Sequence, residues 1–363
     1  MALSTLTAIE ASGLDRPINL ADGHAKLRPA ARHLPGDLLH QLDRRSQVEI
    51  ESKFLRTYGA AANEAVPDAV LFPSASLAID AVAKHLHQSG RLQVGLLEPA
   101  FDNLALLLRR AALDIKPVDE AEEDLVEAAA HCDALVLILP NNPTGWVPSQ
   151  AALSRVAAAA DKSGCLIVCD RTFRFFRPGL GAWPRETACD WITIDDTGKT
   201  WSTLECKTSF VMASNPSALS QVKEIAQEIT LNVSKVALYI ATDAIERENG
   251  AARVRSVVLH NRRELSRTLL PIGYRLSSQS LSVALLELPS DLPFGAAEFS
   301  HFLAVNGIAV LPGPQFYWYE PQRGHSQIRI AMARPPSLFR AGMARICALT
   351  LGRGGRFESQ AMG

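Results

Sequence analysis

The chain has 363 residues, a formal net charge of −1 and a pI near 6.8, and 47% of its residues are hydrophobic. This length and apolar content allow a large buried core and permit one large domain or two. Because the charge is nearly neutral and no basic stripe or polybasic segment is present, the sequence argues against nucleic acid and membrane surfaces as partners.

The N-terminal residues, MALSTLTAIEASGLDRP, lack the basic and apolar segments of a signal peptide, and no apolar run is long enough to span a bilayer. The six cysteines are scattered without the spacing of a zinc site. Buried free thiols in a reducing compartment explain them best. We therefore expect a cytoplasmic protein without a bound metal.

Residues 1–30 have only weak periodicity, and we interpret them as an N-terminal arm. Between about 68 and 213, short apolar runs alternate with helix-like segments such as 76–88 and 151–164. The apolar runs are DAVLF (68–72), LQVGLL (92–97), DALVLIL (133–139), CLIVC (165–169), DWITID (190–195) and TSFVMA (208–213). Runs of this kind suit strands buried on both faces. The pattern predicts the α/β class, with a doubly wound, mostly parallel sheet.

The pattern changes after residue 214. We expect a long helical region over 216–249 and a further helix over 252–270. The remaining predicted elements are strands at 281–288 and 326–333 and helices near 295–305 and 337–350. These elements predict a smaller α+β domain. The expected division is therefore an arm at 1–30, a large domain at 31–249 and a small C-terminal domain at 250–363.

In doubly wound sheets, ligands bind at the carboxyl ends of the strands, so each predicted strand end is a candidate position for chemistry. Four motifs there place Phe101 in EPAFDN, Asn142 in PNNPTG, Asp170 in CDRTF and Lys199 in DDTGK. A fifth segment, PSAS, places Ser74, Ala75 and Ser76 at the start of a helix. These motifs should converge on one edge of the sheet.

This set meets the needs of pyridoxal phosphate (PLP). Lys199 would form the Schiff base, and Asp170 would keep the pyridine nitrogen protonated, so that the ring acts as an electron sink. Phe101 would stack on the ring, and Asn142 would donate a hydrogen bond to the ring hydroxyl. The helix N-terminus at residues 74–76 would bind the phosphate. We also count Thr197, beside the lysine, as a cofactor-binding residue.

Each of these residues has a simpler explanation when it is taken singly. A lysine in a polar turn is usually solvated, Asp170 could cap the next helix, Phe101 could belong to the core, and PNNPTG could be an ordinary turn. Their order along the chain, each at a strand end, favours the cofactor interpretation.

The order of an aromatic residue, NNPTG, Asp-x-x-Tyr/Phe and Lys resembles the fold-type I PLP enzymes over the whole chain. Two positions depart from the usual aminotransferase pattern. Phe173 replaces the usual tyrosine, so no phenol reaches the ring hydroxyl, and Lys207 replaces the usual arginine eight residues after Lys199. Lys207 still supplies a positive charge to the phosphate, without the bidentate fork of arginine.

These departures match a narrower family. Over nearly its full length the chain resembles the PLP-dependent L-arginine oxidases and hydroxylases of non-proteinogenic amino-acid biosynthesis, such as those of the enduracididine and azomycin pathways. The segments that carry the resemblance are LTAIE (6–10), NLADGHAK (19–26), EPAFDN, PNNPTG, DRTF, DDTGKTWSTLECK (195–207), LHNR (259–262), QFYWYEP (315–321) and IRIAMAR (328–334).

The resemblance implies that the arm closes over the substrate. Thr7 and Glu10 in the arm would then contact the guanidinium side of the substrate, and Asp196 would pair with the guanidinium itself. Arg329 would clamp the α-carboxylate, and Asn142 is also expected to contact the substrate. The alternatives are a solvated helix-face charge for Glu10, an N-cap or an ion-pair partner of Lys207 for Asp196, and a structural ion pair for Arg329.

The resemblance also gives His24 a role in positioning water or moving a proton, with Asp22 either orienting it or contacting the substrate. Without the resemblance, His24 would be taken for an ordinary packed or surface histidine. Asp195, which directly precedes Asp196, has no role in this interpretation.

The implied activity is the oxidation of L-arginine by O2, without metal or flavin, with release of ammonia and peroxide. The product would be 4-hydroxy-2-ketoarginine, 2-ketoarginine or a dehydroarginine. The alternatives are an aminotransferase of a basic amino acid, a PLP-dependent hydroxyarginine cyclase and a binding protein without turnover. By analogy with fold-type I enzymes, we expect a homodimer.

Overall fold

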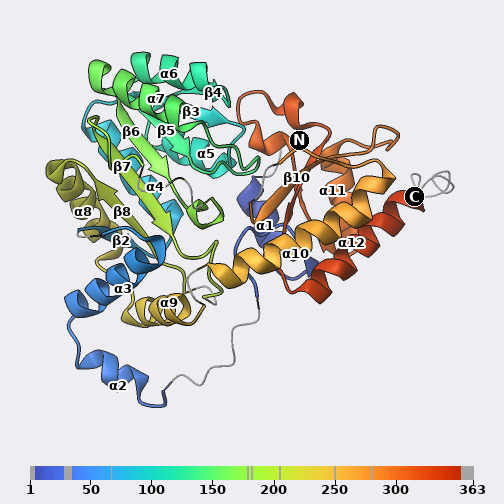
Figure 1. Cartoon of the computed structure of the whole chain (residues 1–363), viewed down its shortest axis with the longest axis horizontal. Coiled ribbons are helices and arrows are strands. Elements are labelled where there is room, and N and C mark those ends of the chain that lie inside the picture. Colours follow the sequence, from blue (N-terminus) through green and yellow to red (C-terminus); the bar gives the residue numbers. More distant parts are fainter. Residues whose placement is uncertain are drawn as a thin grey trace.

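The computed structural model describes residues 5–27, 35–66, 68–177, 180, 183–203, 206–248, 251–278 and 281–352. The expected boundaries at residues 30, 31, 249, 250 and 363 lie outside the described residues. The described residues form a seven-stranded sheet, a four-stranded sheet and a small two-stranded sheet, and helices surround the two larger sheets (Figure 1). None of the helices in the described part of the chain is long and apolar enough to cross a membrane.

The larger sheet has seven strands in the order β2-β8-β7-β6-β5-β3-β4. Their bounds are Val70–Phe72 (β2), Gln93–Glu98 (β3), Asp114–Asp119 (β4), Ala134–Ile138 (β5), Leu166–Asp170 (β6), Trp191–Asp196 (β7) and Ser209–Ala213 (β8). Among these described strands, β8 runs in the direction opposite to the other six. The central strands are buried along their whole length, as the continuous apolar runs predict. The predicted mostly parallel sheet is therefore confirmed.

Two layers of helices cover this sheet. The crossovers β2–α4–β3 and β3–α5–β4 run in one direction along the sheet, whereas β4–α6–β5 and β5–α7–β6 run in the other. Because such crossovers are right-handed, α4 (Ala75–Gln88) and α5 (Asp102–Arg110) lie on one face, and α6 (Glu122–His131) and α7 (Gln150–Ser163) lie on the opposite face. The contacts agree, since α4 packs on α5 and α6 packs on α7.

The smaller sheet is antiparallel, with the order β12-β13-β10-β9. Its strands are Arg275–Leu276 (β9), Val283–Glu287 (β10), Leu311–Pro312 (β12) and Gln327–Ala331 (β13). The helices α10 (Ala252–Leu269), α11 (Ala296–Val305) and α12 (Pro336–Leu351) lie around it (Figure 1). The predicted smaller α+β unit at the C-terminal end is thus present.

The arm has more regular structure than its sequence pattern predicts. It forms the helix α1 (Leu6–Ser12) and the strand β1 (Ile18–Asn19), and β1 pairs in parallel with β11 (Ile308–Ala309). Leu6 and Ala21 pack with Leu311 and Phe316 in a separate apolar cluster. The arm is therefore held by the C-terminal part of the chain, across about 290 residues of sequence.

The expected helical region at 216–249 is two helices, α8 (Pro216–Thr230) and α9 (Lys235–Arg247). The first ends at Leu231, which has a positive φ of 58°, and Ser234 caps the second by accepting a hydrogen bond from the Ala237 N–H. The helices α2 (Leu38–Asp43) and α3 (Gln47–Ala62) lead into the large sheet, and α9 packs against α3.

Candidate functional site

A cavity of about 280 Å³ lies at the carboxyl edge of the larger sheet, between that sheet and the arm. The residues expected at the site that line it are Thr7, Glu10, His24, Ser74, Ala75, Ser76, Phe101, Asn142, Asp170, Asp196, Lys199, Lys207 and Arg329. Asp22 and Thr197 do not line the cavity, although both contact the segments that form it. The sequence motifs, which span more than 300 residues, therefore converge on one place.

The large sheet places most of these side chains. The strand β6 ends at Asp170 and β7 ends at Asp196, and these neighbouring strands are parallel, so both carboxylates reach the same edge. Phe101 immediately precedes α5, and Ser74 caps α4. Two strand ends and two helix N-termini therefore meet at the cavity.

Lys199 follows β7 in a turn that Thr197 stabilises. The Thr197 hydroxyl accepts a hydrogen bond from the Thr208 N–H over 2.9 Å, and the Thr197 N–H donates to the Thr208 carbonyl. Thr197 is fully buried and holds the turn from behind. Thr197 therefore does not line the cavity, and its contacts instead hold the turn that carries Lys199.

Gly198 lets the arm approach this turn. A Cβ at Gly198 would lie 2.8 Å from Cδ2 of His24, which is closer than real Cβ atoms come to other atoms. The Gly198 carbonyl also accepts a hydrogen bond from the Ala25 N–H over 3.0 Å. The absence of a side chain at position 198 thus allows His24 to reach Lys199, with 3.3 Å between Nε2 and Nζ.

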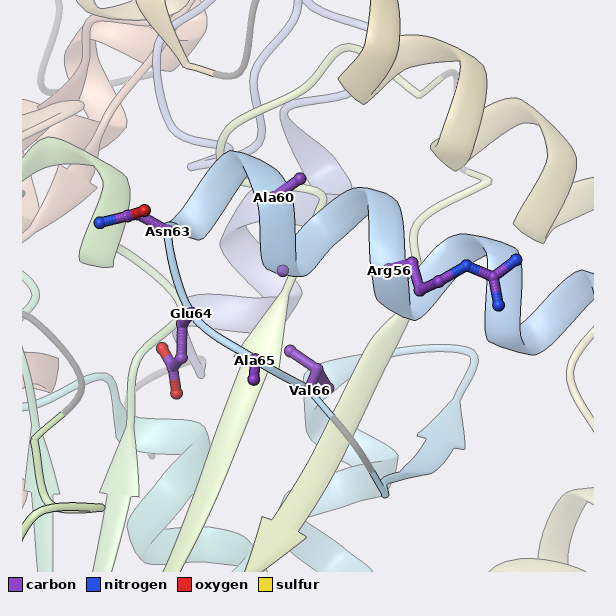
Figure 2. Close-up of a pocket in the computed structure, with 7 residues that line it drawn as sticks. Arg56, Ala60, Asn63, Glu64, Ala65 and Val66 are labelled. Carbon is purple, nitrogen blue, oxygen red and sulfur yellow. The ribbon is translucent and has the colours of Figure 1, made fainter.

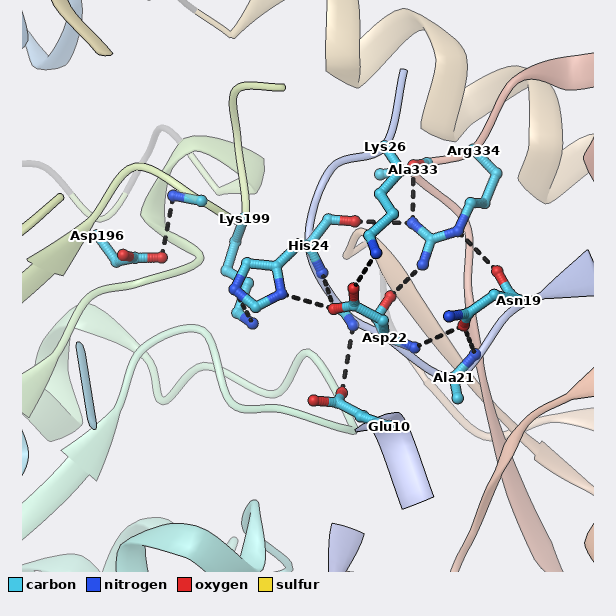
Figure 3. A network of polar contacts seen from close by, with 12 residues as sticks. Glu10, Asn19, Ala21, Asp22, His24, Lys26, Asp196, Lys199, Ala333 and Arg334 are labelled. Carbon is cyan, nitrogen blue, oxygen red and sulfur yellow. Dashed lines mark hydrogen bonds and ion pairs between the residues drawn. The ribbon is translucent and has the colours of Figure 1, made fainter. Parts of the chain in front are cut away.

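Asp22 orients the His24 ring from behind (Figure 3). Its Oδ1 lies 2.5 Å from Nδ1 of His24 and accepts a hydrogen bond from the His24 N–H, and its Oδ2 pairs with Lys26 at 2.8 Å. Burial would raise the pKa of Asp22, but the hydrogen bond and charge of His24, together with Lys199 and Lys26, lower it well below its ordinary range. Asp22 is therefore an ionised anchor for His24, and its carboxylate is occupied by His24 and Lys26.

Arg334 holds the loop that carries Asp22 and His24. Its buried guanidinium donates to the main-chain carbonyls of Asn19 and His24 over 2.8 and 2.7 Å, and also to the carbonyl of Asp22. Figure 3 shows the loop wrapped around this side chain. Arg334 belongs to the IRIAMAR segment, but no local pattern in that segment predicts these contacts.

Asp170 is a buried carboxylate whose environment suits a cationic partner. It is buried, and Oδ1 accepts a hydrogen bond from the Thr172 N–H over 2.9 Å. Desolvation raises the pKa of Asp170 to about 6. The hydrogen bonds from Thr172 lower this pKa, whereas the nearby charges of Asp196 and Asp195 raise it further. A protonated ring nitrogen in the cavity would satisfy this carboxylate.

Asp196 presents one unsatisfied oxygen. Its Oδ2 accepts a hydrogen bond from the Gly198 N–H over 3.0 Å, whereas Oδ1 is buried and has no hydrogen-bond partner within the described part of the chain. Buried carboxylate oxygens are normally paired, so this atom is suited to a hydrogen-bond donor on a ligand.

Glu10 and Arg329 form an ion pair with each other, which matches the structural ion pair left open as the alternative for Arg329, although Glu10 was not expected as its partner. The Glu10 Oε1 lies 3.0 Å from Nη2 of Arg329 and also accepts a hydrogen bond from the Gly23 N–H over 3.2 Å. Burial lowers the pKa of Arg329, and the Glu10 carboxylate opposes that effect. The ring of Phe101 adds a cation–π contact, with its centroid 5.9 Å from the guanidinium carbon.

The start of α4 offers a site for the phosphate of a cofactor. The Ser74 hydroxyl accepts a hydrogen bond from the Leu77 N–H over 3.4 Å, and the Ser76 hydroxyl accepts one from Asn103 over 3.0 Å. Lys207 lines the same cavity. Helix N-termini with an adjacent cation bind phosphate groups, so these residues fit the phosphate of PLP.

Several residues of the cavity were not found from the sequence. Ile79, Asn103, Leu104, Thr172 and Phe173 also line it, although only Phe173 was considered, as a departure from the tyrosine pattern. Asn103 and Thr172 lie within the motifs EPAFDN and DRTF, two residues after Phe101 and Asp170. Their position just after a strand end could have identified them as residues of the site.

A second cavity, of about 560 Å³, lies at the end of α3. Figure 2 shows it along the last turns of the helix and the loop that follows, where Glu64 points away from the helix. Its lining combines Gly59, Ala60, Ala65 and Val66 with the polar side chains of Arg56, Asn63 and Glu64, and none of the motif residues reaches it. The described residues contain no cluster suited to a metal ion and no disulfide between cysteines. The residues expected to carry the chemistry therefore lie at the first cavity.

Comparisons with known proteins agree with this fold. The family model for aminotransferases of class I and II matches residues 24–346. Nicotianamine aminotransferase B of Hordeum vulgare is 27% identical over 184 residues, which are 46% of this chain and 33% of the relative. The chain thus spans about a third of the length of that relative.

Two solved structures superpose over most of the chain. The structure of MppP soaked with the product 2-ketoarginine has a TM-score of 0.80 and 27% identity, and covers 92% of this chain and 99% of MppP. Aspartate aminotransferase from Thermus thermophilus with maleate has a TM-score of 0.75 and 17% identity, and covers 96% and 97% of the two chains. The match to the family model, which extends over most of the sequence, shows that the chain belongs to the aminotransferases of class I and II, whose cofactor is PLP.

Proposed function

We propose that the chain is a PLP- and O2-dependent oxidase of L-arginine. The observation that carries the proposal is the complementary charge of the cavity, because Asp196, whose Oδ1 has no partner among the described residues, and Arg329 both line the same 280 Å³ cavity. An amino acid with a carboxylate at one end and a guanidinium at the other complements both groups. The similarity to MppP, whose solved structure was soaked with 2-ketoarginine as a product, supports this choice of substrate.

In this proposal, a small set of residues holds the cofactor. Lys199 carries PLP, Asp170 pairs with the ring nitrogen, Phe101 stacks on the ring and Asn142 donates to the ring hydroxyl. The residues expected around the phosphate are Ser74, Ala75, Ser76 and Lys207, with Thr197 fixing the turn behind them. When bound, PLP supplies an electron sink for the bonds of the substrate α-carbon.

The remaining residues act on the substrate. Arg329 binds the α-carboxylate, and Asp196 binds the guanidinium with Thr7 and Glu10 of the arm. The Lys199 amine moves the α-proton, and His24, held by Asp22, positions a water molecule or moves a proton at the side chain. Because Glu10 is paired with Arg329 in the structure, its contact with a guanidinium requires it to leave that partner.

The reaction balances with O2 as the oxidant. L-arginine, one O2 and one water give 2-ketoarginine, ammonia and hydrogen peroxide. A second O2 and a second water would give 4-hydroxy-2-ketoarginine and a second peroxide, and a dehydroarginine would result if water does not add. We further propose a cytoplasmic homodimer that acts in natural-product biosynthesis.

A second candidate is an aminotransferase of a basic amino acid, which the family membership favours. The decisive experiment incubates the PLP-loaded protein with L-arginine and follows dissolved O2, peroxide and products by mass spectrometry, with and without added 2-ketoacids. O2 uptake with peroxide and ammonia in the absence of a ketoacid supports the oxidase. Amino transfer that depends on a ketoacid, without O2 uptake, would refute it.

Two variants test the assigned residues. Lys199→Ala should lose the visible absorbance of covalently held PLP, and a variant that retains it contradicts the role of Lys199. Asp196→Asn should raise KM for L-arginine by about 10- to 100-fold, because it removes a charge-assisted pair. The control is Asp190→Asn, an exposed carboxylate just before the same strand, which should leave KM unchanged.

A further inference from the structure

Asp195, which the sequence left without a role, is at the centre of a buried ionic cluster. Its Oδ2 accepts hydrogen bonds from Nη2 and Nε of Arg171 over 2.6 and 3.1 Å, and its Oδ1 accepts one from the Tyr58 hydroxyl over 2.8 Å. Glu64 joins the cluster through Arg171 at 3.2 Å and through Arg174 at 2.5 Å. All of these side chains are less than a tenth exposed.

The cluster lies on the opposite face of the sheet from the candidate site. Successive side chains of a strand point to opposite faces, so Asp195 and Asp196 of β7 point in opposite directions. Asp170 and Ile194 share a small apolar cavity with residues of α4 and α5, which places them on that face. Asp195 instead reaches Tyr58 of α3 on the other side.

Arg171 and Asp195 join two strands at the point where the sheet ladder ends. The last paired residues of β6 and β7 are Asp170 and Ile194, and the Arg171 N–H then donates to the Ile194 carbonyl over 2.8 Å. The bidentate side-chain pair of Arg171 and Asp195 continues the connection one residue further. Asp170 and Asp196, the two carboxylates of the cavity, directly flank this pair in sequence.

We propose that the Arg171–Asp195 ion pair positions Asp170 and Asp196, and so sets the geometry with which the site binds the ring nitrogen of PLP and the cation of the substrate. This inference rests on the roles proposed above for Asp170 and Asp196. Like charges at adjacent strand ends repel each other, and a clamp on the reverse face prevents the two ends from moving apart.

Stability alone does not account for such a cluster. Buried ion pairs are generally no more stabilising than apolar residues of similar volume, because desolvation offsets much of the attraction. Their fixed bidentate geometry, however, specifies one relative position of the joined segments. Gly59 supports this arrangement, since a Cβ there would lie 2.6 Å from the Glu64 carbonyl and would displace the loop that brings Glu64 inside.

The main test is the double variant Arg171→Met/Asp195→Asn. It removes one positive and one negative charge, so that the net charge of the cluster is unchanged, and the introduced amide oxygen can still accept from Tyr58. Stripped protein is titrated with PLP, and KM is then measured for L-arginine and for L-norvaline, whose side chain is uncharged. Because misplacement of a binding group by about 1 Å can cost about 100-fold, we expect the Kd for PLP and the KM for L-arginine to rise by about 10- to 100-fold.

Controls separate positioning from loss of stability. Arg185→Met removes a cation that contacts Glu64 and the Ala65 carbonyl at the outer side of the cluster. Phe339→Leu weakens the buried core at α12. Both variants should lower the melting temperature and keep the wild-type Kd for PLP. The pH dependence of the visible absorption of bound PLP should change in the double variant and in neither control.

The proposal is overturned if the folded double variant binds PLP and L-arginine as the wild type does. If the double variant does not fold, Arg171→Lys decides by the same measurements, since it keeps the charge and loses the bidentate fork. Its Kd for PLP should rise, and an unchanged value would overturn the proposal. Failure of the wild type to oxidise L-arginine would refute the proposed function alone, because the PLP titration does not depend on that reaction.

Discussion

Glu10 of the arm occupies Arg329, with 3.0 Å between Oε1 and Nη2. The same arginine is the proposed clamp for the α-carboxylate of the substrate, so the arm carboxylate and a substrate carboxylate would compete for it. The arm is held to α5 as well, because the Leu6 N–H donates to Asp102 over 2.8 Å. Binding of an amino acid should therefore exchange the partner of Arg329 while α1 stays docked.

The first prediction concerns this exchange. Glu10→Gln should increase the affinity for L-norvaline, which has the α-carboxylate and lacks a guanidinium, by about tenfold, or about 1.4 kcal/mol. The reason is that the amide competes weakly for Arg329. Calorimetric titration of the PLP-loaded protein measures the change, and Glu123→Gln, in an exposed pair with Arg155, is the matched control. Unchanged norvaline affinity would show that Glu10 does not compete.

The second prediction concerns His24. In His24→Ala, consumption of L-arginine should persist while the proportion of hydroxylated product falls, since the proposed role of the ring is to position water. Asp22→Asn should shift the product ratio in the same direction, because His24 Nδ1 loses its ionised partner at 2.5 Å. Mass spectrometry of the products measures both ratios, and an unchanged ratio in His24→Ala would contradict the role.

The third prediction concerns the pH dependence of stability in protein stripped of PLP. Burial raises the pKa of Asp170 from 3.8 to about 6. A carboxyl whose pKa is raised on folding stabilises the fold fully below its unfolded pKa, and this contribution is lost as the pH rises through about 6. The difference between the two pKa values corresponds to about 3 kcal/mol of unfolding free energy, at 1.36 kcal/mol for each unit of pKa.

Asp170→Asn should therefore stabilise the stripped protein at pH 8 by up to about 3 kcal/mol, with little effect at pH 4, and should weaken PLP binding at the same time. Urea unfolding at the two pH values measures the first effect, and titration with PLP measures the second. A variant that is less stable at pH 8 would contradict the assigned environment of Asp170.

The fourth prediction concerns Glu120, which accepts hydrogen bonds from Asn141 over 2.6 Å and from the Thr144 hydroxyl. Desolvation raises the pKa of Glu120 to about 7, against the hydrogen bonds from Thr144 and Asn141. Stability should fall as the pH rises through about 7, by about 1 to 2 kcal/mol because the side chain keeps some contact with solvent. Glu120→Gln in the Asp170→Asn background should lose the remaining pH dependence near pH 7 in melting curves recorded between pH 5 and 9, and a slope equal to that of Asp170→Asn alone would assign it to another group.

The sequence predicted the parts of the molecule that local pattern determines. Continuous apolar runs located six strands of the larger sheet, and the motifs that follow five of these runs contain residues that line the cavity. The edge strand β4, with the sequence DIKPVD, was missed because it carries charges and a proline instead of an apolar run. The helix α1 and the strand β1 are short and depend on partners far away in the sequence, so their own periodicity was weak.

Partners in space were harder to predict than positions along the chain. Glu10 was expected at a substrate guanidinium, and only the folded structure brings it to Arg329. Asp195 could have been separated from Asp196 in advance, because neighbouring residues of a strand face opposite sides. Its partners Arg171, Tyr58 and Arg174 could not, since nothing in their local sequence identifies a buried acceptor 21 to 137 residues away.

The loop around Arg334 has a consequence for the order in which the chain is made. Asn19 and His24 leave the ribosome before Arg334, because the guanidinium that holds their carbonyls is 315 and 310 residues further along the chain. During synthesis the arm lacks this partner until residue 334 has been added, and the segment that carries His24 can reach Lys199 in its final geometry only after that point. Nascent chains that stop before residue 334 should therefore contain the strand ends of the large sheet without a completed site.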